Sequence, residues 1–191
     1  MIRVRDVRQT LQEEANTVNQ KERLNALEVA LNNEMRERAF YLNQAARTRN
    51  PVGKTMFKQI GDEELEHYER LKELHKKWEK QEKWPETLPL KVKNTVVKDV
   101  IAQAVSKLDQ QPQADADDLQ AIRTAIAFEA NGAKNYAKLR DSVSNPKEKD
   151  FFALIAQIEN EHYLSLKDAE EFLTDPESWY RKKEHHVLDG G

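Results

Sequence analysis

Apolar residues recur along most of the chain three or four positions apart, which is the spacing of amphipathic helices rather than of strands. This pattern predicts four long helices, near residues 20–48, 52–82, 117–142 and 147–173. An Asn-Pro pair divides the first two helices at 50–51, and another divides the last two at 145–146. Proline and the residue before it both disfavour a continuing helix. The pattern therefore predicts two helix hairpins.

The two hairpins share a sequence pattern at a constant offset of 95 residues. The identical pairs include Leu24 and Leu119, Glu34 and Glu129, Tyr41 and Tyr136, Phe57 and Phe152, Glu64 and Glu159, and His67 and His162. Self-similarity without gaps indicates a repeated structural unit. We therefore expect two similar hairpins related by approximate twofold symmetry.

Residues 83–116 join hairpin 20–82 to hairpin 117–173, and this connection is longer than most within compact domains. Its length is explained if the second and third long helices run parallel, as in ferritin-like bundles with one long crossover. Apolar residues at helical spacing predict a short fifth helix within it: Val97, Val100, Ile101, Ala104, Val105 and Leu108. We expect an all-α, ferritin-like four-helix bundle, a single domain over 1–191 with a tail at 174–191.

Composition agrees with this fold and narrows the function. The chain has 34% charged residues but only 5 Gly and 6 Pro, as long solvated helices require. A net charge of -3 argues against nucleic acid as a partner. The absence of cysteine excludes disulfides, thiol catalysis and thiolate-bound metal. Without a signal sequence or a long apolar stretch, we expect a cytoplasmic protein that does not bind membranes.

Acidic residues interrupt the apolar stripes at matching positions. Glu64 and His67 lie three residues apart and so share one helix face, as do Glu159 and His162. A glutamate occurs 30 residues before each of these pairs, so that the candidate metal ligands are Glu34, Glu64, His67, Glu129, Glu159 and His162. One Glu from each of two helices plus Glu-x-x-His from the other two is the ligand set of dinuclear carboxylate bundles. Two divalent cations would neutralise four buried carboxylates.

A single Glu-x-x-His motif is more typical of an exposed salt-bridged helix face than of a metal site. The repetition of the motif in register with flanking aromatic residues favours a metal site here. Oxygen and imidazole ligands suit both iron and manganese. We predict two iron ions, with manganese as the alternative.

Four segments carry a family resemblance: 27–45, 57–71, 122–139 and 152–166. They resemble the four helices of rubrerythrin and its ferritin-like relatives. The resemblance implies a diiron site that reacts with hydrogen peroxide or dioxygen, in a homodimer or larger homo-oligomer. Rubrerythrins usually add a rubredoxin domain with four cysteines, which this chain lacks, so electrons would come from an external electron-donor protein. Rubrerythrins also carry a further glutamate where this chain has Gly132.

Glu37 is the position equivalent to Gly132 in the first hairpin, and it is a candidate additional metal ligand; a surface residue paired with arginine is the alternative. Gly132 itself leaves room for a moving ligand, a small molecule or close helix packing. Tyr41 and Tyr136 are candidates for hydrogen bonds to ligands on an antiparallel neighbour, with ordinary core packing as the alternative. Glu63, Glu66 and Glu161 are expected on the solvent side.

In the tail, His185 and His186 are adjacent, so their side chains diverge and are not expected to bind metal. Trp179, Tyr180, Val187 and Leu188 are expected to hold the tail against the bundle or a second subunit.

The leading functional hypothesis is an oxidoreductase of rubrerythrin type, reducing hydrogen peroxide or dioxygen with external electrons. A ferroxidase or iron-storage protein is the alternative, and a bundle with a purely structural metal site is a second alternative.

Overall fold

The computed structural model describes residues 4–80, 95–106 and 115–181, which are helical apart from short connections and contain no strand. The helices are α1 (Val4–Arg47), α2 (Pro51–Glu79), α3 (Val97–Ser106), α4 (Ala116–Ser142) and α5 (Pro146–Thr174). None of them, within this described part of the chain, combines the length and apolar character that a membrane span requires.

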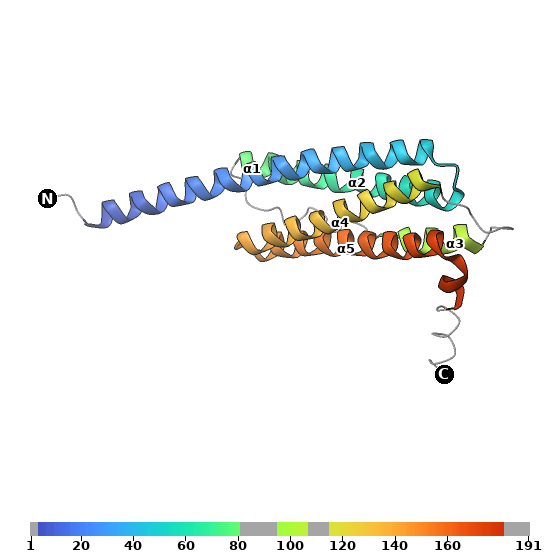
Figure 1. The fold of residues 1–191 in the computed structure, drawn as a ribbon. Coiled ribbons are helices and arrows are strands. Elements are labelled where there is room, and N and C mark those ends of the chain that lie inside the picture. Colours follow the sequence, from blue (N-terminus) through green and yellow to red (C-terminus); the bar gives the residue numbers. More distant parts are fainter. Residues whose placement is uncertain (1–3, 81–94, 107–114, 182–191) are drawn as a thin grey trace.

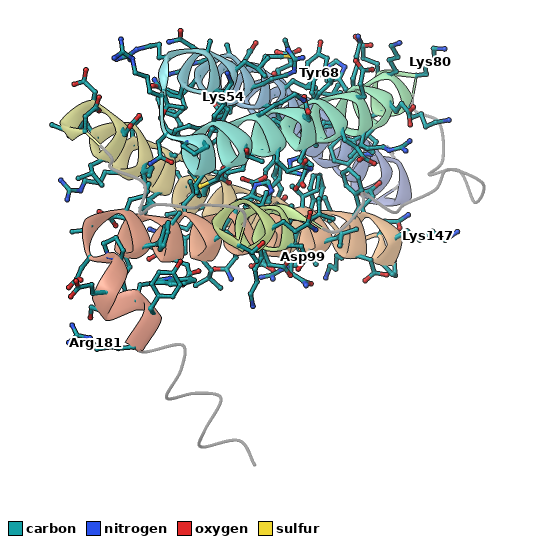
Figure 2. All side chains as sticks on the ribbon, turned by 90° about the vertical axis from the view of Figure 1, so that its right-hand side faces the viewer. Lys54, Tyr68, Lys80, Asp99, Lys147 and Arg181 are labelled. Atoms are coloured by element: carbon teal, nitrogen blue, oxygen red, sulfur yellow. The ribbon has the colours of Figure 1, made fainter. Side chains whose placement is uncertain are left out.

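The hairpin of α1 and α2 packs on the hairpin of α4 and α5 (Figure 1). Helices α2 and α4 start at the same end of the bundle and run parallel, whereas α1 and α4 run antiparallel (Figure 1). Helix α3, which carries the labelled Asp99, lies against α2 and α5 on one face (Figure 2). The predicted all-α ferritin-like bundle and the short crossover helix are confirmed; Leu108 lies outside the described residues.

The two hairpins turn in the same way because the same cap is used twice. Asn50 and Asn145 are extended, with φ of -72° and -70°, and each side chain accepts hydrogen bonds from the backbone amides two and three residues ahead. Pro51 and Pro146 follow at the first helical position, where the missing N–H would have no helical partner. The cap thus ends one helix and starts the next within three residues.

The predicted start of the first helix at residue 20 was wrong, because α1 begins at Val4. No glycine or proline occurs anywhere in α1, and Gln, Glu and Arg, all good helix formers, recur in its first part. A charged segment without a breaker therefore continues the helix, which projects beyond the bundle (Figure 1). The predicted end of the second helix at 82 lies outside the described residues, and the bounds of α4 and α5 agree with prediction to within one residue.

Two apolar clusters fill the bundle. One includes Tyr41, Phe57, Ile60, Ile122 and Phe172. The other includes Leu27, Leu71, Trp78, Phe152 and Ile155. Along each long helix, the candidate ligands fall between the positions of one cluster and those of the other. A polar layer therefore crosses the middle of an apolar core.

After a break at Asp175 the chain turns away from the direction of α5 and forms a short helix over residues 176–181 (Figure 1). The Trp179 Nε1–H donates to Asp168 Oδ1 at 2.9 Å, and the Trp179 ring packs 5.0 Å from that of Phe172. The Tyr180 ring lies 6.0 Å from that of Phe172. The predicted contact of this segment with the bundle is confirmed for Trp179 and Tyr180, whereas His185, His186, Val187 and Leu188 lie outside the described residues.

We predict that Asn50→Ala lowers the free energy of unfolding by about 1 kcal/mol, because Asn50 Oδ1 accepts from both Val52 N and Gly53 N at 3.0 Å. Urea denaturation measures the change. Asn43→Ala, at an exposed position of α1, is the control and should be nearly neutral. Equal effects in the two variants would contradict the capping role.

Candidate metal centre

The structure brings all six predicted ligands together in the polar layer. Glu34 comes from α1, Glu129 from α4, and the two Glu-x-x-His pairs come from α2 and α5. None of the six side chains is more than 2% exposed. Their helices supply the apolar flanks, so these charged groups are fixed in position by the packing around them.

The six residues form two overlapping groups of four. One group is Glu34, Glu64, His67 and Glu159, and the other is Glu64, Glu129, Glu159 and His162. Within each group, one donor atom per residue lies within 4.8 Å of the others. Glu64 and Glu159 belong to both groups. The arrangement therefore offers two adjacent sites that share two carboxylates and differ in their remaining glutamate and histidine.

The histidines turn the same ring nitrogen toward the carboxylates. His67 Nδ1 lies 3.1 Å from Glu64, 3.2 Å from Glu159 and 3.3 Å from Glu34. His162 Nδ1 lies 3.3 Å from Glu129 and 3.6 Å from Glu64. Each imidazole thus reaches its group through Nδ1.

The donor set fits divalent cations. Buried atoms without a hydrogen-bond partner include Glu34 Oε2, Glu64 Oε1, Glu129 Oε2, both carboxylate oxygens of Glu159, and His162 Nδ1. Such atoms are costly to bury unless something binds them. Carboxylate oxygens and imidazole nitrogens in this number suit iron or manganese.

The electrostatics of the metal-free chain lead to the same conclusion. Burial, followed by repulsion from Glu64, raises the pKa of Glu34 to about 8. Burial and the charges of Glu64 and Glu129 raise the pKa of Glu159 well above its ordinary value. Burial alone would also raise the pKa of Glu64, but the neighbouring histidines lower it. Protons therefore occupy the centre where cations would otherwise balance the charge.

Both histidines share in this balance. Burial tends to lower the pKa of His67, but the charge of Glu64 outweighs it and raises that pKa well above its ordinary value. The charge of Glu129 has the same effect on the pKa of His162. A metal ion would displace these protons.

Two tyrosines bind candidate ligands across the bundle. The Tyr41 hydroxyl on α1 donates to Glu129 Oε1 on α4, and the Tyr136 hydroxyl on α4 donates to Glu34 Oε1 on α1. Each hydrogen bond fixes one oxygen of a carboxylate and leaves the other directed at the centre. The two bonds are equivalent under the offset of 95 residues.

Glu63 is a functional candidate that the sequence analysis wrongly assigned to the solvent side. Its side chain is only 14% exposed, and the His162 Nε2–H donates to Glu63 Oε2 at 2.7 Å. Gln59 Nε2 and Val96 N donate to the other oxygen of Glu63. This contact assigns the proton to Nε2 and leaves Nδ1 free for a metal. The helical spacing of residues around Glu63 gave no sign of this role, because its hydrogen-bond partner, His162, lies on a different helix.

The second histidine lacks this support. The residue equivalent to Glu63 in the second hairpin is Ile158, and His67 Nε2 is buried without a hydrogen-bond partner. The two sites are therefore alike in their ligands but different in what orients their histidines.

Gly132 makes room for a ligand. A Cβ at this position would lie 2.7 Å from Glu159 Oε2. Of the three explanations offered for Gly132, room for a metal ligand fits this contact, because the ligand that needs the space is Glu159. The space in which a side chain at 132 would begin is occupied by Glu159.

Glu37, the candidate seventh ligand, lies at the edge of the centre and belongs to neither group of four. It is half-buried, and burial together with repulsion from Glu64 and Glu129 raises its pKa to about 9. Glu66 and Glu161 were also expected on the solvent side, and both are only partly exposed; Glu161 accepts a hydrogen bond from Gln157.

We predict that Glu63→Gln weakens metal binding at the group of donors that contains His162 by about 10- to 100-fold, because the loss of a carboxylate that orients a ligand histidine typically has an effect of this size. Titration with Mn(II) against a competing chelator measures the two affinities. Glu66→Gln on the same helix is the matched control and should leave both affinities unchanged. Equal weakening in both variants would exclude a specific role for Glu63.

We also predict that the free energy of unfolding of the metal-free chain falls as pH rises from about 5 to about 8. The upper limit of this range is the pKa of Glu34, which is raised to about 8. The pKa values of Glu34, Glu159 and both histidines are raised, so the folded chain holds protons that the unfolded chain releases in this range. The lowered pKa of Glu64 affects stability only at more acidic pH. The melting temperature should therefore fall across the range.

Added Mn(II) should raise the melting temperature, and most strongly at pH 8, where protons compete least with the metal. A variant in which both His67 and His162 are replaced by alanine keeps the four carboxylates and should respond much less. A metal-free melting temperature that rises with pH, or a full response of the double variant, would contradict this account.

Comparison with known proteins agrees with the geometry. No curated protein and no solved structure matches the chain. The family model described as Rubrerythrin matches residues 25–170, a range that contains all six candidate ligands together with Tyr41, Tyr136 and Glu63. The match spans most of the chain, as the sequence resemblance implied. The chain therefore belongs to the rubrerythrin family.

Proposed function

We propose that this chain is a dinuclear-iron oxidoreductase that reduces hydrogen peroxide or dioxygen with electrons from an external donor protein. In this proposal Glu34 and His67 would hold one ion, Glu129 and His162 would hold the other, and Glu64 and Glu159, which belong to both groups of donors, would contribute to both. The bound ions would supply two electrons to the oxidant. Manganese is the alternative metal.

The observation that carries the proposal is the sharing of Glu64 and Glu159 by two groups of buried donors. A purely structural site needs only one ion with a closed set of ligands. A pair of adjacent ions suits a reaction that requires two electrons at one place. The family match supports the same reaction class.

The surrounding residues would perform three tasks. Tyr41 and Tyr136 orient Glu129 and Glu34 by hydrogen bonding. The two apolar clusters exclude water from the layer between them. Glu37 would hold a proton on its carboxyl group at neutral pH and deliver it to the reduced oxygen atoms. A carboxyl group that keeps its proton at neutral pH is better suited to this task than to binding a metal.

We expect a homodimer or larger homo-oligomer. Iron storage, the main alternative, would require uptake of many iron ions per chain. The stoichiometry of iron therefore separates the two functions before any turnover is measured.

We predict that anaerobic Fe(II) binds at two ions per chain and that hydrogen peroxide is consumed catalytically when a reductant is supplied. Glu64→Ala and Glu159→Ala should lower both metal content and turnover by at least about 100-fold, because each removes a ligand shared by both ions. Glu66→Ala and Glu161→Ala are the matched controls and should retain both. Uptake of many ions per chain, or two ions without turnover of peroxide or dioxygen, would overturn the proposal.

A further inference from the structure

A cavity of about 460 Å³ lies between α1 and α4. Glu34, Glu37 and Gly132 line it near the candidate metal centre, and Ala26 and Ser142 line it farther along the same helices. These residues span about eleven positions on α1 and ten on α4, or roughly 15 Å at 1.5 Å per residue. The cavity is thus elongated and has the centre at one end.

The size of the cavity exceeds what the smallest oxidants need. A water molecule occupies about 30 Å³ of liquid, and hydrogen peroxide and dioxygen are of similar scale. Pockets of about 300–1,000 Å³ are typical of sites for organic molecules. A passage for peroxide alone would not require a cavity of this volume.

The lining suits a molecule with an apolar body and a polar head. Ala26, Val29, Ala30 and Leu139 supply apolar surface along the cavity. Glu34, at the inner end, is a buried candidate metal ligand. Asn33, Asn135 and Lys138 add polar groups to the walls. A largely apolar cavity that ends at the candidate metal centre favours a ligand whose hydrocarbon part lies along the cavity and whose reactive group meets the centre.

We propose that this cavity binds an organic hydroperoxide, with its hydrocarbon part between α1 and α4 and its hydroperoxy group at the end formed by Glu34 and Gly132. This inference rests on the proposed oxidoreductase function and names its substrate class. The O–O bond breaks as the hydroperoxide accepts two electrons and two protons, and it yields one alcohol and one water. The external donor protein is oxidised by the same two electrons.

Binding can be measured without turnover. The probe is 2-phenylpropan-2-ol, the alcohol formed from cumene hydroperoxide, added to the full-length metal-free chain and followed by ligand-observed NMR. Asn135→Phe should fill the cavity and weaken binding by about tenfold or more. Asn131→Phe is the matched control, since Asn131 is an exposed asparagine of the same helix that does not line the cavity. The control should bind as the unmodified chain does.

A second pair of variants tests the opposite wall. Val29, which is 59% exposed, lines the cavity on α1, whereas Met35, which is 40% exposed, does not. Val29→Trp should weaken binding and Met35→Trp should not. Retained helical content and metal binding in each variant show that the fold and centre are intact.

Turnover then tests the substrate. With the iron-loaded chain, Asn135→Phe and Val29→Trp should lower kcat/KM for cumene hydroperoxide by about tenfold or more, with less than about a twofold change for hydrogen peroxide. The inference would be overturned by equal losses for both peroxides or by the absence of saturable binding of the alcohol. It would also be overturned if a second copy of the chain occupied the cavity. Failure to reduce the two peroxides and dioxygen alike would instead overturn the proposed function.

Discussion

Four carboxylates buried at one level of an apolar bundle are the constraint on which the rest of this structure depends. Each of Glu34, Glu64, Glu129 and Glu159 is almost fully excluded from solvent. Burying one such charge without compensation costs several kcal/mol. In the metal-free chain, protons on carboxylates and histidines reduce the cost, and two divalent cations would remove it. The apolar clusters on either side keep water away from this layer, so the buried carboxylates must be neutralised by protons or by metal ions.

The duplicated hairpin supplies this layer by repetition, because each hairpin contributes two glutamates and one histidine at equivalent positions. The exceptions to the symmetry occur beside the centre. On the side of α2 and α5, Glu63 accepts a hydrogen bond from His162 Nε2, whereas Ile158 stands at the equivalent position and His67 Nε2 has no hydrogen-bond partner. On the side of α1 and α4, Glu37 and its equivalent Gly132 line the same cavity, and only Glu37 has a side chain. The first difference means that only His162 is oriented by a carboxylate at Nε2. The second leaves a cavity between α1 and α4 beside the candidate metal centre.

The crossover contributes to the centre as well as joining the hairpins. Val97 of α3 is fully buried in one apolar cluster, and Val96 N donates to Glu63. The position of a residue that orients His162 thus depends on a segment outside the four-helix repeat. A crossover that only covered the bundle would not contact a residue bound to a candidate ligand.

The sequence by itself determined the helices, the hairpins and the six candidate ligands. Period and spacing are local properties: Glu-x-x-His lies on one helix face whatever surrounds it, and a repeat at 95 residues requires two similar units. Only the tertiary structure decided the contacts between helices. Glu63 reaches His162 across 99 positions of sequence, and Glu159 fills the space beside Gly132. Such contacts depend on how helix faces pack, and a sequence period does not encode which residue of a neighbouring helix will face it.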